Sequence, residues 1–212
     1  MNTLILIPAL NEAENLSFVI DSIPNNFDVL VVDDGSADNT SEIAEALGAT
    51  VVSHNQNLGY DAAIESGLIF AHKNKYKFCI TIDADGQHSS QLLCKFNETL
   101  RIGADLVYGS RNEFGCFAEF LYAIVCKLRF GINDPMCGMK GYRVDTIMAA
   151  VFEINKYNLI GSEVLLKAVR IGMRVRTVDV QVKRRLNGES RFGGLFVANY
   201  RTCCAIVRSF RV

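Results

Sequence analysis

Residues 78–88 read Phe-Cys-Ile-Thr-Ile-Asp-Ala-Asp-Gly-Gln-His, and this stretch decides how the rest of the chain is interpreted. Its first five residues favour a buried strand, which runs directly into Asp83 and Asp85 and then into a glycine turn. Two carboxylates so close raise each other's ionisation cost unless a cation lies between them, and hard divalent cations such as Mg²⁺ prefer oxygen ligands. Asp and Gly are also ordinary turn residues. The stretch alone therefore leaves a metal site and a solvated turn open.

The length and charge of the chain exclude several classes of protein. With 212 residues, 50% of them hydrophobic, and a net charge of −1, the chain is expected to form one domain with a substantial core. This composition fits neither a disordered protein nor a nucleic-acid-binding protein. Residues 1–110 hold 15 acidic and 5 basic residues, whereas residues 170–212 hold 10 basic and 2 acidic ones. The acidic half could bind a metal and the basic tail could bind an anion, which suits a phosphate-bearing ligand. A basic tail that is only exposed to solvent would have the same composition.

Cysteine usage and hydropathy indicate the compartment. The 7 cysteines are odd in number and show no Cys-x-x-Cys spacing, which predicts reduced thiols and no zinc site. We expect no signal peptide, because residues 1–3 lead directly into a predicted strand, and no apolar run approaches the roughly 18 residues of a membrane span. We therefore expect a cytoplasmic protein.

Short apolar runs alternate with helical patterns in the first half of the chain. The predicted strands are residues 3–7, 27–32, 50–53, 78–82 and 105–109, and the predicted helices are residues 15–22, 36 or 38 to 47, 59–73 and 89–101. We expect Pro8 to end the first strand, and Ser36 or Asp38 to cap the second helix. Strands that are apolar on both faces and alternate with helices predict an α/β protein, in which helices flank both faces of a mostly parallel sheet.

Polar loops follow three of the predicted strands. They carry Asn11 and Glu12, then Asp33 and Asp34, then Asp83 and Asp85. Ligands of parallel sheets bind beyond the carboxyl ends of the strands, so these loops should converge at one edge. If the acids after residues 78–82 were only part of a solvated turn, there would be no reason for acidic loops to follow two other strands as well. This convergence favours the metal site.

The alternation changes after Arg111. Residues 113–130 are mostly apolar and end with Lys127 and Arg129, which predicts an amphipathic helix that either packs on the core or faces a membrane or an acceptor. Further predicted elements are a strand at 139–143, helices at 144–152 and 161–171, a strand at 174–182, a basic loop at 183–194 and a helical tail from 196. The chain lacks the phosphate loop, the dinucleotide fingerprint, the nucleophile elbow and the His-Glu-x-x-His motif. Phosphate binding should therefore depend on a metal and on arginines.

Six motifs, in their order along the chain, resemble landmarks of family 2 glycosyltransferases of the GT-A fold. They are Ile7-Pro8-Ala9-Leu10-Asn11-Glu12, Val31-Val32-Asp33-Asp34-Gly35-Ser36, Asn57-Leu58-Gly59-Tyr60, Asp83-Ala84-Asp85-Gly86-Gln87-His88, Gly109-Ser110-Arg111 and Asp134-Pro135-Met136-Cys137-Gly138. The loop at residues 185–191, Arg-Leu-Asn-Gly-Glu-Ser-Arg, resembles the Arg-x-x-Gly-x-Ser-Lys loop of dolichyl-phosphate-mannose synthase and related polyprenyl-phosphate glycosyltransferases. The resemblance implies one GT-A domain over residues 1–212 with a Rossmann-like sheet. Residues 1–110 would form its nucleotide-sugar-binding half and residues 111–212 its acceptor half.

The resemblance also implies the donor side of the site. It assigns nucleotide-sugar binding to residues of all three acidic loops, namely Pro8, Ala9, Leu10, Glu12, Asp33, Asp34, Asp83, Ala84 and Asp85. A carboxylate that accepts a base N–H suits uracil or guanine, so we expect a UDP- or GDP-linked sugar. The implied metal ligands are Asp83, Asp85 and Gln87, whose oxygen atoms, together with diphosphate oxygens, fit Mg²⁺ or Mn²⁺.

The resemblance also implies phosphate binding by Arg111, Arg185 and Arg191, either to the donor or to a lipid acceptor, and by Arg129 on the acceptor side. Arginine presents a planar fork of donors that matches phosphate oxygens. The implied catalytic residues are Asp85, Arg185 and Glu163. Glu163 is included because hydroxyl-directed relatives carry an acid near this helix start, where it would act as a base. A glutamate that only complements the helix dipole would give the same pattern.

The predicted function is metal-dependent, inverting transfer of a sugar from a nucleoside-diphosphate sugar to polyprenyl phosphate, such as undecaprenyl or dolichyl phosphate. Inversion is implied by the resemblance alone. Such an acceptor implies peripheral contact with the inner face of a membrane. Two alternatives stay open: the same donor chemistry onto a hydroxyl of a glycan or lipid-linked saccharide in surface polysaccharide synthesis, and a non-catalytic nucleotide-sugar-binding module. A sugar-nucleotide pyrophosphorylase would instead need a Gly-rich, basic loop after the first strand.

Overall fold

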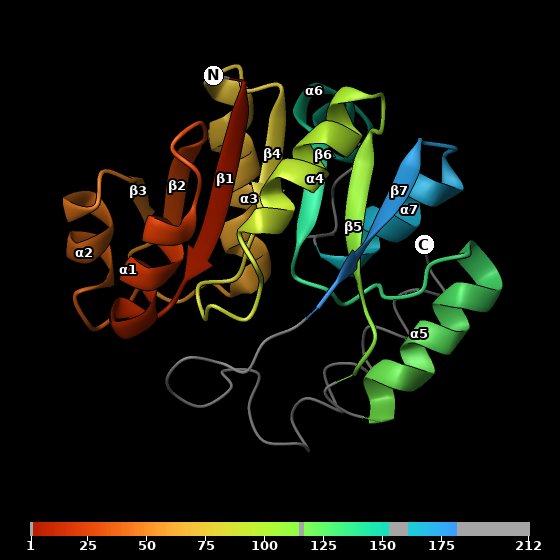
Figure 1. Cartoon of the computed structure of the whole chain (residues 1–212), viewed down its shortest axis with the longest axis horizontal. Helices are drawn as coiled ribbons and strands as arrows, with labels where there is room; N and C mark the ends of the chain where they lie inside the picture. The colour runs from red at the N-terminus through yellow and green to blue at the C-terminus, as the bar shows by residue number, and fades with distance from the viewer. Residues whose placement is uncertain (1, 115–116, 153–160, 182–212) are drawn as a thin grey trace.

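The computed structural model describes residues 2–114, 117–152 and 161–181 (Figure 1). The predicted basic loop and helical tail lie outside these ranges. The described strands are β1 (Thr3–Ala9), β2 (Asp28–Asp33), β3 (Thr50–Ser53), β4 (Phe78–Thr81), β5 (Leu106–Arg111), β6 (Lys140–Arg143) and β7 (Val175–Val180). The described helices are α1 (Ala13–Ser22), α2 (Thr40–Ala46), α3 (Tyr60–Lys73), α4 (Gln91–Arg101), α5 (Phe117–Phe130), α6 (Val144–Ile147), the π-helical η1 (Met148–Phe152) and α7 (Ser162–Arg170).

Within the described ranges the strands form one sheet in the order β3-β2-β1-β4-β6-β5-β7. All neighbouring strands are parallel except β6, which runs antiparallel between β4 and β5. The predicted mostly parallel α/β sheet is therefore confirmed. Because β6 runs in the opposite direction, the loop that precedes it enters the sheet at the carboxyl ends of β4 and β5. This loop, residues 131–139, thus joins the edge at which ligands are expected.

Alternation along β1 divides the core between the two faces of the sheet. Ile5 and Ile7 pack with residues of α1, α2 and α4, whereas Leu4 and Leu6 pack with residues of α3, α5, α6 and α7. All four side chains are buried, as expected for a central strand covered on both faces. Figure 1 shows α1 and α4 in front of the sheet and α3 behind it.

The prediction that Pro8 ends the first strand is wrong, because β1 continues to Ala9. The amide of Ile82 donates to the carbonyl of Leu6, so Leu6 faces β4, and Pro8, two residues later, faces the same side. The pairing of β4 with β1 stops at Leu6, while β2 pairs with β1 as far as Ala9. An N–H at position 8 would point to the side where β1 has no paired strand. Proline is tolerated there because no hydrogen bond of the sheet is lost.

Asp105 holds the start of β5 at the opposite, amino edge of the sheet. Its carboxylate accepts hydrogen bonds from Nε, Nη2 and the amide of Arg174 at 2.9–3.0 Å, and Nε of Arg143 lies 3.3 Å away. The hydrogen bonds from Arg174 lower the pKa of Asp105 and outweigh the effect of its partial burial. The ionised form of Asp105 is therefore preferentially stabilised by folding.

We predict that Asp105→Asn lowers the free energy of unfolding at pH 7, and that the difference from the wild type shrinks as the pH falls. A carboxyl group with a lowered folded pKa contributes stability above its unfolded pKa of about 3.9 and loses it as the pH falls through the folded value. Urea denaturation between pH 7 and pH 3 measures the difference. Asp145→Asn is the control, because the Asp145 side chain is 82% exposed beside His72. A pH-independent difference for Asp105→Asn would contradict this assignment.

Candidate active site

The predicted convergence of three polar loops occurs at the carboxyl edge of the sheet. After β4, the chain passes through Asp83 and Asp85 and turns at Gly86, whose φ is 73°. The amide of Gln87 donates to Oδ1 of Asp85 at 3.1 Å, which fixes this carboxylate within the turn. The Asp83 side chain is 28% exposed, so it is held by the protein and still accessible to a ligand.

Asp83 is surrounded by a group from its own loop and by groups from two distant segments. The hydroxyl of Tyr60, at the start of α3, donates to Oδ1 of Asp83 at 3.1 Å. Nδ1 of His88 lies 3.4 Å from Oδ2. Gly138, in the loop before β6, lies so close that a Cβ there would come within 2.2 Å of Oδ2 and 2.6 Å of Oδ1. Only glycine therefore fits at position 138 while Asp83 keeps this orientation.

The hydroxyl end of Tyr60 is desolvated although the residue as a whole is 41% exposed. This desolvation and the neighbouring Asp83 raise the pKa of Tyr60 above its ordinary value, so the hydroxyl stays protonated and acts as a donor. The sequence motif at residues 57–60 was noted, but no role was predicted for Tyr60. The glycine before Tyr60 was the available sequence signal. Gly59 has a φ of 100°, a conformation that favours glycine, and α3 begins at the next residue, Tyr60.

The side chains at the end of β4 fit a hard divalent cation. Asp83, Asp85 and Gln87 offer oxygen atoms, the ligand type that Mg²⁺ and Mn²⁺ prefer. The buried Nδ1 of His88, facing Asp83, has no hydrogen-bond partner, which indicates that a polar ligand completes this region. Within the described part of the chain, no three His, Cys, Asp or Glu side chains form a metal-binding group. The assignment of Asp83, Asp85 and Gln87 as metal ligands therefore stays a prediction.

Asp34 is committed to hydrogen bonds within the protein. Its Oδ1 accepts from the amide of Leu58 at 2.9 Å and lies 2.7 Å from Nδ1 of His54, and its Oδ2 accepts from the amide of Gly59 at 2.8 Å. Asp34 thereby positions the loop that leads to Tyr60. No local sequence pattern indicates this role of His54, because the pairing spans 20 residues.

Asp33 has a similar role one residue earlier. Its Oδ1 accepts from the amide of Ser36 at 2.9 Å, and its Oδ2 accepts from the hydroxyl of Ser41. Both carboxylates of the second loop are buried. The predicted contact of Asp33 and Asp34 with a nucleotide stays a prediction, since their carboxylate oxygens mostly accept hydrogen bonds from groups of the protein itself.

The first and second loops are joined by side chains. The hydroxyl of Ser36 accepts from the amide of Asn11 at 2.8 Å, and Oδ1 of Asn11 accepts from the amide of Ala37 at 2.7 Å. The expectation that Ser36 or Asp38 caps α2 is wrong, because neither residue occupies the cap position. Asn39 occupies the cap position without a side-chain cap bond, while Asp38 accepts from the amide of Thr40. The hydroxyl of Ser36, in the second loop, accepts from the amide of Asn11 in the first loop, so Ser36 links the two loops.

The remaining predicted nucleotide-binding residues lie on this same edge. Pro8 and Ala9 end β1 and are buried, and Leu10 is half-buried beside them. Glu12 is buried; its Oε2 accepts from Asn15 at 2.8 Å and its amide donates to the hydroxyl of Thr40 at 3.0 Å. Ala84 is also buried. The structure thus brings all of the predicted donor-side residues to one edge.

Arg111 forms the main ion pair on the acceptor side. Its Nε and Nη2 donate to the two carboxylate oxygens of Asp134 at 2.7 and 3.0 Å, and Nη2 also donates to Glu119 at 3.3 Å. Asp134 is fully buried. The Arg111 fork therefore positions the loop before β6, and its predicted phosphate contact stays a prediction. Arg129 is exposed on α5, and Arg185 and Arg191 lie outside the described residues.

Lys140 is a buried cation behind the carboxylates. Its Nζ donates to the carbonyl of Cys137, and the residue is 4% exposed. Burial lowers the pKa of Lys140, although the nearby Cys137, Asp134 and Asp83 oppose this shift. Sequence reasoning missed Lys140; the signal was a lysine within a predicted buried strand.

Glu163 is buried in the first turn of α7, and its predicted role as a base stays a prediction. The preceding Gly161 has a φ of 78°, and a Cβ there would lie 3.1 Å from Oδ1 of Asp61, the neighbour of Tyr60. The first turn of α7 therefore lies beside the first turn of α3. Burial at a helix N-terminus fits both a base and a carboxylate that complements the helix dipole.

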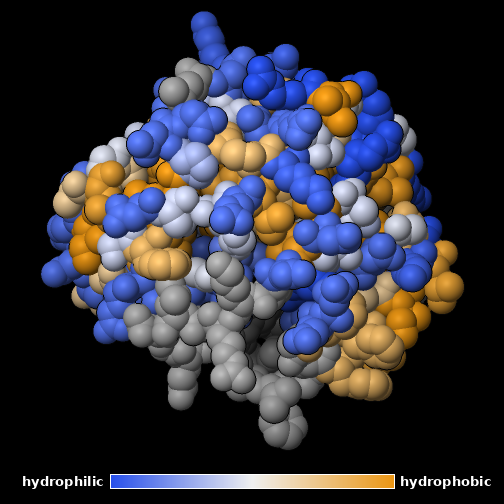
Figure 2. Space-filling view, viewed as in Figure 1, coloured by the Kyte–Doolittle hydropathy of each residue, from blue (hydrophilic) through white to orange (hydrophobic). Residues whose placement is uncertain are grey.

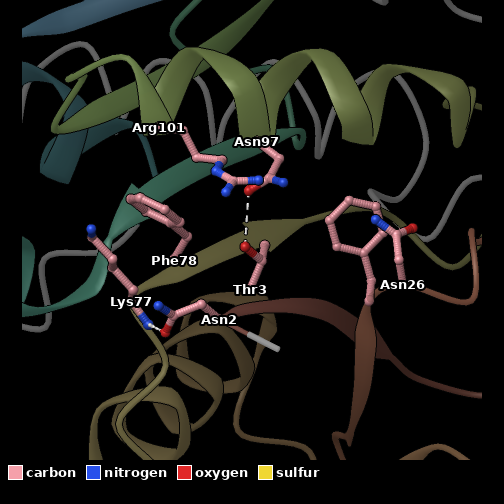
Figure 3. Close-up of a pocket in the computed structure, with 8 residues that line it drawn as sticks. Asn2, Thr3, Asn26, Lys77, Phe78, Asn97 and Arg101 are labelled. Atoms are coloured by element: carbon pink, nitrogen blue, oxygen red, sulfur yellow. Dashed lines mark hydrogen bonds between the residues drawn. The ribbon is translucent and has the colours of Figure 1, made fainter.

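A separate pocket of about 390 Å³ lies at the amino edge of the sheet. Its lining residues include Thr3 at the start of β1 and Phe78 at the start of β4, and Arg101 at the end of α4 (Figure 3). The hydroxyl of Thr3 donates to Asn97 at 2.8 Å within it. Since the acidic loops follow the opposite ends of these strands, this pocket is not part of the candidate active site.

Comparison with known proteins shows the family of the chain. The family model of glycosyl transferase family 2 matches residues 4–122. An undecaprenyl-phosphate mannosyltransferase of Micrococcus luteus is 30% identical, covering 92% of this chain and 88% of its own. A polyprenol monophosphomannose synthase of Mycolicibacterium smegmatis is 26% identical, covering 91% of this chain and 81% of its own.

The fold matches a solved structure as well. Glucosyl-3-phosphoglycerate synthase from Mycobacterium tuberculosis, in complex with Mn²⁺, uridine diphosphate and glucosyl-3-phosphoglycerate, superposes with a TM-score of 0.74 at 22% identity. The superposition covers 97% of this chain and 79% of the other, and it confirms the predicted GT-A fold. Because the family model spans more than half of the residues and the curated relatives cover most of the chain, this protein is a glycosyltransferase that belongs to glycosyl transferase family 2.

Proposed function

We propose that the protein is a metal-dependent, inverting glycosyltransferase that moves one sugar from a nucleoside-diphosphate sugar to polyprenyl phosphate. The observation that carries this proposal is the convergence of the loops after β1, β2 and β4 on one edge, with Asp83 and Asp85 at its centre. The names of the two curated relatives support the lipid-phosphate acceptor.

The donor side is pre-organised for a nucleotide. Loops after β1 and β2 are held together by Ser36 and Asn11, so a base and ribose would meet a surface that is already ordered. Carboxylates of the second loop accept N–H donors from the protein, and a uracil or guanine N–H would use their remaining acceptor capacity. A pre-formed surface reduces the entropy lost on binding.

Asp83, Asp85 and Gln87 would hold the divalent metal together with the donor diphosphate. A metal in this position neutralises the charge that develops on the diphosphate as the sugar leaves. Within the protein, Tyr60 donates to Asp83 and limits its rotation, and Gly138 leaves room for its carboxylate. When it is protonated, the buried Lys140, which donates to the carbonyl of Cys137, would offset part of the negative charge of these loops.

A phosphate acceptor simplifies the remaining chemistry. A phosphate monoester is largely anionic near neutral pH, since its second pKa is about 6, and it therefore needs no catalytic base. Its orientation by cations is then sufficient, which is the role proposed for Arg111, Arg129, Arg185 and Arg191. A sugar hydroxyl would need a base, and the buried Glu163 is the residue that would supply it.

The proposed acceptor places the reaction at a membrane surface. Within the described residues, no helix has the length and apolarity needed to cross a bilayer. Because its polyprenyl chain would be held in a bilayer, the proposed acceptor implies peripheral contact with the inner face of a membrane.

The acceptor class is tested with the purified chain, Mn²⁺ or Mg²⁺, and a panel of UDP- and GDP-linked sugars. Release of nucleoside diphosphate that depends on polyprenyl phosphate, with a lipid-linked sugar as product, is the expected result. Release that depends only on a glycan hydroxyl, and that Glu163→Gln abolishes, would replace the proposal with the hydroxyl-directed alternative. Donor binding without any turnover would indicate a non-catalytic module.

We predict that Asp85→Ala reduces turnover by at least about a hundredfold while the melting temperature stays close to that of the wild type. Asp85 is half-exposed in a turn, so its removal should cost little packing. Asp21→Ala, an exposed aspartate in α1, is the control and should retain activity. Turnover of Asp85→Ala at the wild-type level would refute the metal assignment.

We predict that Gly138→Ala weakens Mn²⁺ binding by about tenfold or more, because the added Cβ must displace the carboxylate of Asp83. Electron paramagnetic resonance of Mn²⁺ titrated into the protein measures the affinity. Gly141→Ala in β6 is the control, since its Cβ would meet only Leu100 and Phe96, at 3.1 and 3.4 Å. Equal Mn²⁺ affinity in folded Gly138→Ala and the control would show that Asp83 does not bind the metal in this orientation.

A further inference from the structure

We infer that the outward face of α5 is the surface by which the protein docks on an anionic lipid bilayer. This inference rests on the proposed function, because a polyprenyl acceptor is presented by a bilayer. It names the element that makes the contact and the headgroup charge that favours it.

The outward face of α5 consists of large apolar side chains. Leu128 is 82% and Phe117 71% exposed, and the other members of this face are Phe120, Leu121 and Ile124. Relative to Phe117 they occur at spacings of 3, 4, 7 and 11 residues, which places all five on one side of a helix. In Figure 2, apolar residues gather at the lower right, where Figure 1 shows α5. An exposed patch of this kind on one element marks an interaction surface.

This apolar face is not required by the core. The opposite face of α5 already contributes Ala118, Tyr122, Ala123 and Cys126 to the buried interior. The sequence analysis left open whether this helix packs on the core or faces a membrane. The helix packs on the core with one face, and its second apolar face is exposed among the described residues.

The charges on α5 favour an anionic partner. Its one acidic residue, Glu119, points inward to Arg111, with a side chain 13% exposed. Lys127 and Arg129, in the last turn, are both exposed. Lys127 lies three residues after Ile124 and seven after Phe120, so it borders the apolar face. Long basic side chains beside an apolar face are typical of helices that lie in the interface of an anionic membrane.

The same charges disfavour a second copy of this chain as the occupant. A symmetric contact would place the same residues on both sides. Each partner would then bring Lys127 to the contact and no exposed acid from α5 to neutralise it. Anionic phospholipids, in contrast, attract each basic residue near the surface.

The position of α5 connects this face to the candidate active site. Arg111, at the end of β5, forms an ion pair with Glu119 in the first turn of α5. The hydroxyl of Tyr122 in α5 lies 3.4 Å from the hydroxyl of Ser162 at the start of α7. The N-terminal turns of α5 are therefore attached to the carboxyl edge of the sheet. A bilayer against α5 would present a lipid phosphate beside the edge that binds the donor.

Flotation of the full chain with lipid vesicles that contain no polyprenyl phosphate tests the inference. The wild type should float with phosphatidylcholine vesicles that contain added phosphatidylglycerol, and much less with phosphatidylcholine alone. Leu128→Ser should weaken partitioning by about tenfold, because the exposed leucine side chain of the wild type would become buried in the lipid and serine would not replace that contribution. Lys127→Glu should weaken it by about fivefold or more on the anionic vesicles only.

Matched controls lie at the amino edge of the sheet. Ile102, which follows α4, is 81% exposed, and Lys73 ends α3 on the surface. Ile102→Ser and Lys73→Glu should float as the wild type does. No flotation of the wild type, or equal flotation of Leu128→Ser and Ile102→Ser, would overturn the inference. A wild-type dimer in solution that Leu128→Ser dissociates would also overturn it, in favour of a second copy.

Transfer to a short, water-soluble prenyl phosphate without vesicles separates this inference from the proposed function. Transfer without flotation would overturn the docking surface alone. Flotation that depends on Leu128, without transfer to any prenyl phosphate, would overturn the proposed acceptor and leave a lipid-docking surface.

Discussion

The carboxylate of Asp83 lies directly against the backbone of Gly138, and this contact joins the topology of the sheet to its chemistry. Gly138 reaches Asp83 because β6 runs antiparallel and enters the sheet at the carboxyl ends of β4 and β5. A parallel strand in the same place would begin at the opposite edge. The hydroxyl of Thr81 fixes the entry, since it donates to the carbonyl of Gly138 at 2.7 Å and accepts from the amide of Lys140 at 3.0 Å. The strand that presents the acidic turn therefore also holds the loop that closes over it.

Gathering carboxylates at one edge is electrostatically costly, and the protein offsets the cost with fixed donors. Asp34 accepts two backbone N–H bonds and pairs with His54, and Asp33 accepts from two serines. These bonds satisfy buried carboxylates that water cannot reach. Asp83 and Asp85 are more accessible, so they are the carboxylates available to an incoming cation. The same edge thus contains acids that maintain the loops and acids that can act on a ligand.

The sequence was sufficient to predict the fold and the edge of the sheet at which the acidic loops meet, because both depend on local patterns. Alternating apolar runs predict the sheet, and acids that directly follow strands must lie at its carboxyl edge. The antiparallel course of β6 was not predicted, because a four-residue strand carries no signal of its direction. The pairing of His54 with Asp34, the proximity of Tyr60 to Asp83, and the burial of Lys140 depend on contacts between distant segments, which a periodicity does not encode. Arg111 was predicted to be a phosphate ligand, whereas its position beside Asp134 also gives it a structural role.

The central claim is that Asp83, Asp85 and Gln87 bind a divalent metal that also binds the diphosphate of a nucleotide. A crystal structure of the protein with Mn²⁺ and UDP or GDP, with data collected at the manganese absorption edge, tests it most directly. The account predicts one anomalous difference peak at the turn after β4, bounded by these side chains and by two phosphate groups, with the base against the loops after β1 and β2. A peak at any other place, or a nucleotide bound at this edge with an identical pose when Mn²⁺ is omitted, would contradict it.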